Sequence, residues 1–288
     1  ILRMSLKELF ESTPGFRKWS LGLIGIGVLS LIIGYVVYGT GNEEHQARFW
    51  GVLLHNSIYF LLVTNAVMFF FCATTLSLAG FQISFKRVTE AISACVPVIG
   101  GITFVVMLCI VAGHKSMIYE WLDKAAVAKD AALSGKSGFL NPGFFMTWTV
   151  LAIGLWSVLG YKMRSISRKT DDHPLSVEEG KKFMFKNTIW ASLFIIWYAL
   201  TIAAVIPWLW LMSLNAHWYS TLYSWYIFAS SFVAGIALIS VFVVYMKNKG
   251  YLEYTNKEHL HDLGKFQFAF SIFWTYLWFA QFMLIWYA

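Results

Sequence analysis

The chain has 288 residues, of which 58% are hydrophobic, 18% aromatic and only 13% charged. Soluble domains contain about 25% charged residues, so this composition excludes an ordinary soluble enzyme and a disordered protein. The net charge of +7 comes from basic residues that lie between apolar runs, which is typical of membrane topology and not of nucleic-acid binding. We therefore expect an all-α, polytopic transmembrane helix bundle.

Seven segments are long and apolar enough to cross a hydrocarbon core of about 30 Å as helices. In chain order they cover residues 19–38, 49–72, 88–113, 143–161, 188–212, 225–246 and 266–288. Residues 1–18 precede them, and we expect this segment to lie on the cytoplasmic membrane interface. The chain starts without Met and stops inside an apolar run, which indicates a fragment of a longer protein.

The loops predict the orientation. Of the 22 Lys and Arg, 17 lie in the N-terminal segment and the second, fourth and sixth loops, and 5 lie in the other loops. The positive-inside rule therefore places the N-terminus in the cytoplasm. Capping-box pairs predict that three helices begin on this side, before the membrane: Ser5 with Glu8, Ser176 with Glu179 and Thr255 with Glu258.

Few polar residues lie inside the spans. Every charged side chain is in a loop or near the end of a span, and the missing central carboxylate disfavours a pump or transporter built around one. Span two contains His55, Asn56 and Asn65, and His114 ends span three. Both histidines belong to the predicted outer half of the membrane.

Three interpretations of His55 and His114 stay open. The imidazoles bind quinol and accept its proton, or they ligate a haem as a pair. In the third, His55 is a hydrogen-bonded residue between helices and His114 lies at the interface. A haem pair should lie at matching depth in two spans, which disfavours the second interpretation.

Span seven carries a polar stripe. Its members recur at steps of four and three residues, which places them on one helix face: Gln267, Ser271, Trp274, Trp278 and Gln281. Such a face packs against another helix through amide and hydroxyl bonds, or it lines a proton path. The path would start at residues on the predicted cytoplasmic side, namely His261, Asp262, Lys265 and, in span three, Glu90.

The sequence contains no nucleotide-binding, nucleophile or metal-binding motif. We therefore expect neither a catalytic nor a metal-ligating residue in this chain. The three cysteines, Cys72, Cys95 and Cys109, lie in or beside apolar stretches and fit small packing residues.

The segment from His261 to the end contains Asp-Leu-Gly-Lys at 262–265, Phe-Trp at 273–274, Gln281 and Leu-Ile-Trp-Tyr-Ala at 284–288. It closely resembles the NrfD-like membrane subunits of alternative complex III, most closely the second of the two such subunits, the ActF type. Elsewhere the chain agrees with this family in span count, predicted N-terminal side and aromatic richness.

The resemblance implies a subunit of a quinol:electron-acceptor oxidoreductase in a bacterial inner membrane. Its partners would be multihaem and monohaem cytochromes c, an iron-sulfur subunit, a sister NrfD-like subunit and lipids. The partners hold the haem c and the Fe-S clusters, whereas NrfD-like proteins ligate no cofactor. The resemblance also implies that quinol, either menaquinol or ubiquinol, would bind at the complex.

The resemblance also implies a fold of about ten spans that includes two four-helix bundles. Residues 19–38 would then be the first span, 39–212 the first bundle with spans two to five, and 213–288 the start of the second. A quinol site in this family pairs a histidine with an acidic residue. His55 has no carboxylate in the membrane, and Glu120 and Asp123 in the third loop are the nearest acidic candidates.

We therefore expect a non-redox subunit that anchors the iron-sulfur and cytochrome c subunits and contributes a quinol site or a cytoplasmic proton half-channel. The alternative is a secondary transporter or an ion-conducting membrane protein. Such folds usually contain inverted repeats around a mid-membrane site, and no convincing repeat relates the seven predicted spans.

Overall fold

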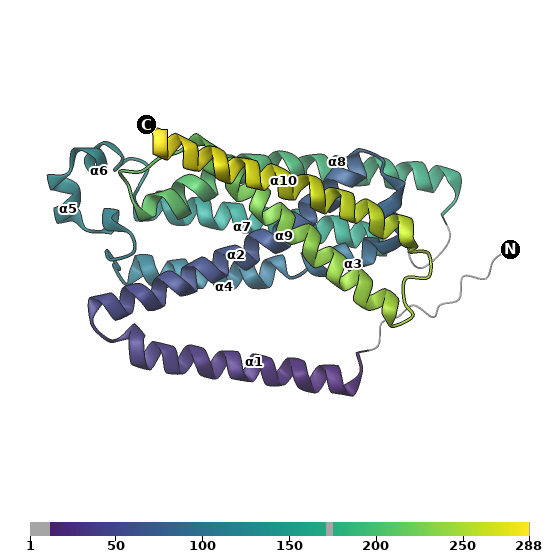
Figure 1. Cartoon of the computed structure of the whole chain (residues 1–288), viewed down its shortest axis with the longest axis horizontal. Coiled ribbons are helices and arrows are strands. Elements are labelled where there is room, and N and C mark those ends of the chain that lie inside the picture. Colours follow the sequence, from purple (N-terminus) through teal and green to yellow (C-terminus); the bar gives the residue numbers. More distant parts are fainter. Residues whose placement is uncertain (1–11, 171–174, 288) are drawn as a thin grey trace.

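A computed structural model describes residues 12–170 and 175–287 (Figure 1). Within these residues the chain is helical without β-strands, and seven helical stretches are long and apolar enough to cross a membrane. Each overlaps one predicted span, so the expected all-α, polytopic bundle is confirmed. The stretches are Pro14–Gly39, Glu43–Leu76, Gly80–Ala112, Pro142–Arg168, Val177–Leu214, Thr221–Asn248 and Lys257–Tyr287.

Four stretches are single α-helices: α2 (Glu43–Leu76), α7 (Pro142–Arg168), α9 (Thr221–Asn248) and α10 (Lys257–Tyr287). The long loop between α4 and α7 contains three short helices: η3 (Glu120–Leu122), α5 (Lys124–Lys129) and α6 (Ala131–Gly135). This loop projects from one end of the bundle (Figure 1). We call it the α5–α6 end, and the charge distribution predicts that it is the outer one.

Each of the other three stretches combines α-helix with π-helix or 3₁₀-helix. In the first, α1 (Pro14–Gly34) continues into the π-helical η1 (Tyr35–Gly39). The third comprises the 3₁₀-helix η2 (Gly80–Phe85), α3 (Lys86–Ser93) and α4 (Val96–Ala112), and the fifth comprises α8 (Val177–Leu200), the π-helix η4 (Thr201–Leu211) and the 3₁₀-helix η5 (Met212–Leu214). Pro207 lies inside η4, where it donates no backbone hydrogen bond.

The central helix of the bundle is α2. Two clusters of buried apolar side chains share it: one includes α4, α7, α8 and η4, and the other includes α3, α9 and α10. It meets α9 tightly at Gly235, where a Cβ atom would lie 3.2 Å from Ala66 Cβ and 3.3 Å from backbone atoms of Val63 and Val67. Glycine at this position therefore allows the two helices to touch.

Polar contacts inside the first cluster connect the long loop to the membrane helices. Tyr119, which precedes η3, is fully buried and its hydroxyl donates to the Trp210 carbonyl at 2.9 Å. The Trp210 indole in turn donates to the Thr149 hydroxyl of α7 at 3.0 Å. The loop is therefore packed onto the bundle and does not extend freely from it.

By contrast, α1 lies beside the bundle and joins it at one end (Figure 1). None of its residues is buried against the described chain. The junction is aromatic, because Tyr35 packs edge-on against Phe49 and Trp50 at ring distances of 6.2 and 6.4 Å. The rest of α1 has an open surface, and a Cβ atom placed on Gly22, Gly25 or Gly27 would have no heavy atom within 4 Å.

The three capping predictions have different outcomes. The Ser5–Glu8 pair lies outside the described residues. The Ser176–Glu179 box is confirmed, with both reciprocal bonds present at 3.3 and 2.9 Å. The third prediction is wrong by one residue: Asn256 accepts from the His259 amide at 3.1 Å, while the Thr255 hydroxyl bonds to the Ser84 carbonyl at 3.3 Å.

Candidate functional site

The two histidines singled out in the membrane lie on exposed surfaces. On α2, His55 shares a face with exposed Val52 and Tyr59, whereas Leu54 and Ile58 point into the core. His114 is exposed just after α4, with a left-handed backbone φ of 47°. Within the described residues neither imidazole forms a hydrogen bond, and no contact brings the two together. Their assignment to a quinol site stays a prediction.

A histidine–carboxylate pair does form at the α5–α6 end, between two other residues. His217 Nε2, in the loop before α9, lies 2.6 Å from Asp130 Oδ2, at the start of α6. Lys136 Nζ also donates to the carbonyl of Ala216. We call these two contacts the loop clasp, because they join the third and fifth loops.

The electrostatics of Asp130 fit this arrangement. Desolvation raises the pKa of its carboxyl, but hydrogen bonds from the Ala132 and Leu133 amides and the His217 imidazole outweigh that effect. The pKa therefore lies below its usual value. Those amides lie 2.7 and 3.3 Å from Oδ1, so Asp130 caps α6 and holds His217 at the same time.

Further polar contacts extend along the same end. Lys115 Nζ donates to Gln46 Oε1 at 2.7 Å, which joins the third loop to α2. Ser220, before α9, donates to Gln281 Oε1 of α10 at 2.8 Å. The acidic candidates Glu120 and Asp123 are exposed, and Asp123 caps α5 through the Ala125 amide at 2.8 Å. Polar side chains thus hold the loops of this end together.

Glu90, a predicted proton entry, is buried at the opposite end. Its carboxylate pairs with Arg87 and lies 3.7 Å from Lys86 Nζ. Arg87 also donates to the Ser167 hydroxyl of α7 at 3.1 Å. This arrangement ties α3 to the end of α7 through a buried carboxylate.

The polar stripe of span seven divides into two parts on α10. Gln267, Trp274 and Gln281 are spaced by seven residues and face α9: Gln281 bonds Ser220, and the Trp274 ring lies 6.3 Å from that of Tyr226. Gln267 Oε1 and Trp274 Nε1 are buried without a hydrogen-bond partner in the described part of the chain. The structure thus places this part of the stripe at a helix–helix contact.

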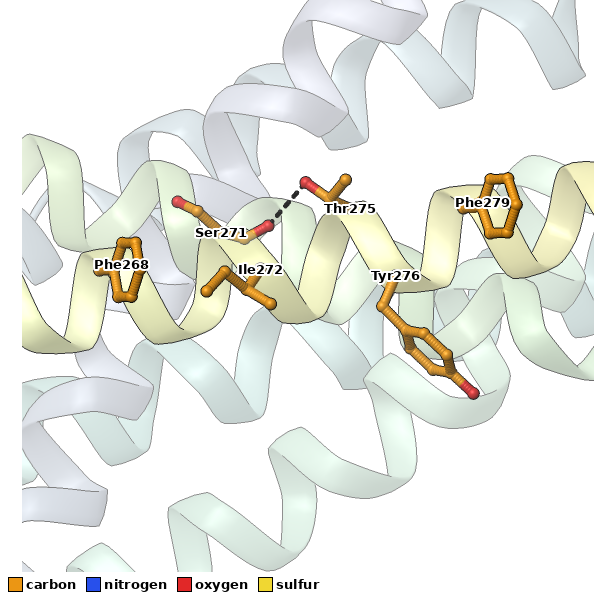
Figure 2. Close-up of a pocket in the computed structure, with 6 residues that line it drawn as sticks. All are labelled: Phe268, Ser271, Ile272, Thr275, Tyr276 and Phe279. Carbon is orange, nitrogen blue, oxygen red and sulfur yellow. Dashed lines mark hydrogen bonds between the residues drawn. The ribbon is translucent and has the colours of Figure 1, made fainter.

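Ser271 lies on the outer surface of α10, in an open groove of about 460 Å³ (Figure 2). The other lining residues are Phe268, Ile272, Thr275, Tyr276 and Phe279, all from the same helix. The Thr275 hydroxyl donates to the Ser271 carbonyl at 2.9 Å. Trp278 is also exposed, and it stacks on Phe282 at 6.4 Å.

The predicted cytoplasmic entry to the stripe lies on exposed surface at the start of α10. Lys265 Nζ lies 3.1 Å from Asp262 Oδ1, and both side chains are solvent accessible. His261 is exposed one position earlier. Between this pair and Trp274, the α9-facing side of α10 contains Gln267 and the aromatic Phe270, which packs on Phe232 at 4.4 Å.

Among residues 12–170 and 175–287, no cluster of three or more His, Cys, Asp or Glu side chains has an arrangement suited to a metal ion. No model of a known protein family matches the chain, and no curated protein sequence matches it. The site therefore has to be interpreted from its own residues.

The Asp130–His217 pair has no direct signal in the sequence. The two residues lie in different loops, and spacing does not report contacts between loops. One local signal was available: Asp130 directly precedes the α6 segment Ala131–Gly135, and Asp is a preferred N-cap. That signal identifies the cap but not the imidazole that completes the clasp.

Proposed function

We propose that the chain is a non-redox membrane subunit of a quinol-oxidising complex of the alternative complex III type. In this proposal it lies in a bacterial inner membrane with its N-terminus in the cytoplasm. It anchors the iron-sulfur and cytochrome c subunits at the α5–α6 end and contacts a sister NrfD-like subunit within the membrane. The motifs at residues 262–265, 273–274 and 284–288 support it, and their described residues, up to Tyr287, lie on α10.

The observation that carries the subunit assignment is the position of α1. A membrane-length helix with no residue buried against the described part of its chain contacts lipid or another protein. Small residues at a helix surface allow close backbone approach, which drives association of membrane helices. The open glycines of α1 favour a protein neighbour, and we assign this neighbour to the sister subunit.

The surface of α10 supports the same assignment. Its exposed groove contains the hydroxyl groups of Ser271 and Thr275 among aromatic side chains. The Thr275 hydroxyl is satisfied within α10, but pure lipid offers no hydrogen-bond partner for the Ser271 hydroxyl, whereas a neighbouring helix does. Only Leu263 and Leu277 of α10 are buried within the described chain, so most of the helix is open to a partner.

Roles in quinol binding and proton transfer belong to the proposal as well. Quinol would contact His55 and His114, which lie on open surfaces where a partner subunit completes the site. Protons would enter from the cytoplasm near Asp262 or Glu90. Quinol itself and the partners' haem c and Fe-S clusters would supply the redox chemistry, which this chain's side chains do not.

Purification from the native membrane tests the subunit assignment. We expect an affinity-tagged chain to co-elute with haem c absorbance and with an iron-sulfur protein. The Gly25→Leu variant should lose at least about 90% of that haem, because leucine prevents close approach at α1. A chain that is stable, alone and colourless after purification from its own host would refute the proposal.

The matched control is Gly154→Leu. Gly154 also lies in a membrane helix, α7, and is exposed with no heavy atom within 4 Å of a Cβ. We expect this variant to keep its full haem complement. Equal retention by Gly25→Leu and Gly154→Leu would remove α1 as the interface.

A further inference from the structure

A second polar site lies in the interior of the bundle, where α2, α8 and α9 meet. Asn65 of α2 has no exposed surface, and both its amide nitrogen and its amide oxygen are without a hydrogen-bond partner in the described chain. Tyr198 of α8 is equally buried, and its hydroxyl likewise has no partner there. Three polar atoms of two residues are therefore unsatisfied deep within the helices.

Phe69 connects the two residues. It follows Asn65 by one turn on the same face of α2, and its ring stacks on the Tyr198 ring with 4.9 Å between centroids. The same ring meets Phe228 and Phe232 of α9 at 5.4 Å each. Tyr198 thus packs on Phe69 at the junction of three helices, and buried Asn65 lies one turn away from Phe69 on α2.

The neighbouring hydroxyl groups are satisfied by their own helices. Thr64 donates to the carbonyls of Phe60 and Leu61 at 2.9 and 3.0 Å. The Ser231 hydroxyl of α9 donates to the Ile227 carbonyl at 2.7 Å, and its oxygen remains an acceptor beside the Tyr198 hydroxyl. The side-chain amide of Asn65 has two N–H donors and an acceptor oxygen. The described residues of α2, α8 and α9 provide no hydrogen-bond partner for either its nitrogen or its oxygen.

We propose that Asn65 and Tyr198 bind ordered water at this junction. A buried water typically makes two to four hydrogen bonds to otherwise unsatisfied polar groups. Asn65 provides donors and an acceptor, and the Tyr198 hydroxyl provides one of each. Water therefore satisfies the Asn65 amide, for which no described side chain provides a partner, and the hydrogen-bonding capacity of the Tyr198 hydroxyl that Ser231 leaves open.

The site is closed and does not form part of a continuous polar path. On the buried face of α8, Ala191 and Phe194 separate Tyr198 from Asn187, the next polar residue toward the end that carries Glu90. Phe194 stacks against Tyr198 at 5.9 Å. Water held here exchanges slowly with the surroundings. The site does not depend on the proposed subunit function, nor on the α10 stripe.

Radiolytic hydroxyl-radical footprinting of the intact chain in lipid nanodiscs tests the proposal, because radicals formed from bound water oxidise the side chains beside it. Tyr119 is the internal reference: it is as buried as Tyr198, but its hydroxyl is bonded to the Trp210 carbonyl. We expect Tyr198 to be oxidised at least about fivefold faster than Tyr119.

The Asn65→Leu variant should lower the oxidation of Tyr198 to the level of Tyr119, and the Thr64→Val variant should leave it unchanged. Equal oxidation of Tyr198 and Tyr119 in the native chain would overturn the proposal, as would unchanged Tyr198 oxidation in Asn65→Leu. If Asn65→Leu does not accumulate, the comparison of the two tyrosines in the native chain decides the question alone.

Discussion

Consecutive membrane-spanning helices, α1 and α2, have opposite positions in the molecule. Within its most apolar 18-residue window, α1 has 0% of residues buried, whereas α2 has 72%. Yet α1 is the more apolar of the two. Lipid tails solvate apolar side chains as well as a protein interior does. The apolarity of a helix therefore determines whether it lies in the membrane, but not whether it packs against other helices.

Side-chain shape accounts for the difference. The aromatic run Phe69–Phe71 of α2 interlocks with other helices; Phe70 alone packs against Phe81, Phe232 and Phe266 at ring distances of 5.7 to 6.3 Å. From Leu21 to Gly34, α1 presents aliphatic side chains, glycines and Ser30 on its open surface. Interlocking surfaces gain dispersion energy over lipid, and no such complementary surface faces α1 among residues 12–170 and 175–287.

Removing a large side chain from each helix should give the largest contrast. Phe70→Ala in α2 leaves a cavity, and a cavity costs roughly 24 cal/mol per Å³, so we expect a loss of about 2–3 kcal/mol in unfolding free energy. Ile26→Ala in exposed α1 should change it by less than about 0.5 kcal/mol. Reversible denaturation in mixed micelles measures both. Equal effects would contradict the difference in packing.

Adding a methyl group sharpens the same contrast. Gly235→Ala places a Cβ 3.2 Å from Ala66 Cβ and 3.3 Å from the backbone of α2, and such overpacking costs about 1–2 kcal/mol. Gly25→Ala meets open space and should raise stability by about 0.5 kcal/mol through helix propensity. Thermal unfolding of the two variants should therefore shift in opposite directions. A shift of both in the same direction would show that α1 is packed.

A smaller effect is expected at α10, which is nearly as exposed as α1 but is held by a polar contact. Ser220→Ala removes the bond to Gln281, and hydrogen bonds between membrane helices contribute about 0.6 kcal/mol. Thr275→Ala is the control, since that hydroxyl bonds within α10 itself. Hydrogen exchange should increase at the end of α10 only in Ser220→Ala. Equal exchange in both variants would contradict a role for the contact.

The smallest effect concerns the loop clasp and is local. Because the native pKa of Asp130 lies below its ordinary value of about 3.9, the clasp contributes fully above that value and its contribution is lost as the pH falls through the lower native pKa. We expect exchange protection of the Ala132 and Leu133 amides, corrected for intrinsic rates, to decline in that range. Asp130→Asn should abolish this dependence. If the protection of these two amides in the native chain did not change with pH in this range, the predicted role of Asp130 would be refuted.

The sequence predicted the seven spans well because bilayer thickness sets the length of an apolar run. It did not predict the rotation of each helix about its axis, which depends on neighbours far along the chain. His55 shows this limit: the run from Phe49 to Cys72 places it in the membrane, but contacts with α4, α8 and α9 decide that its side chain points outward.

The candidate site shows a similar division. The spacing from Gln267 to Gln281 identified one face of α10, and that face divides because α9 covers only part of it. The Asp130–His217 pair joins two loops, and periodicity carries no information about such contacts. At the start of α10, Thr255 and Asn256 are both suitable caps by residue type, so only the structure distinguishes them.

The isolation of α1 has a consequence for biogenesis. Chains emerge from the ribosome N-terminus first, so α1 enters the bilayer before any other described helix exists. No later helix among the described residues buries any residue of α1, so α1 is complete in lipid as soon as it is made. By contrast, α2 completes its packing only after α9 has been made, because Gly235 of α9 packs against Ala66 of α2. Of the described helices, the first to be made is thus free for recruitment by another polypeptide while the others are still being translated.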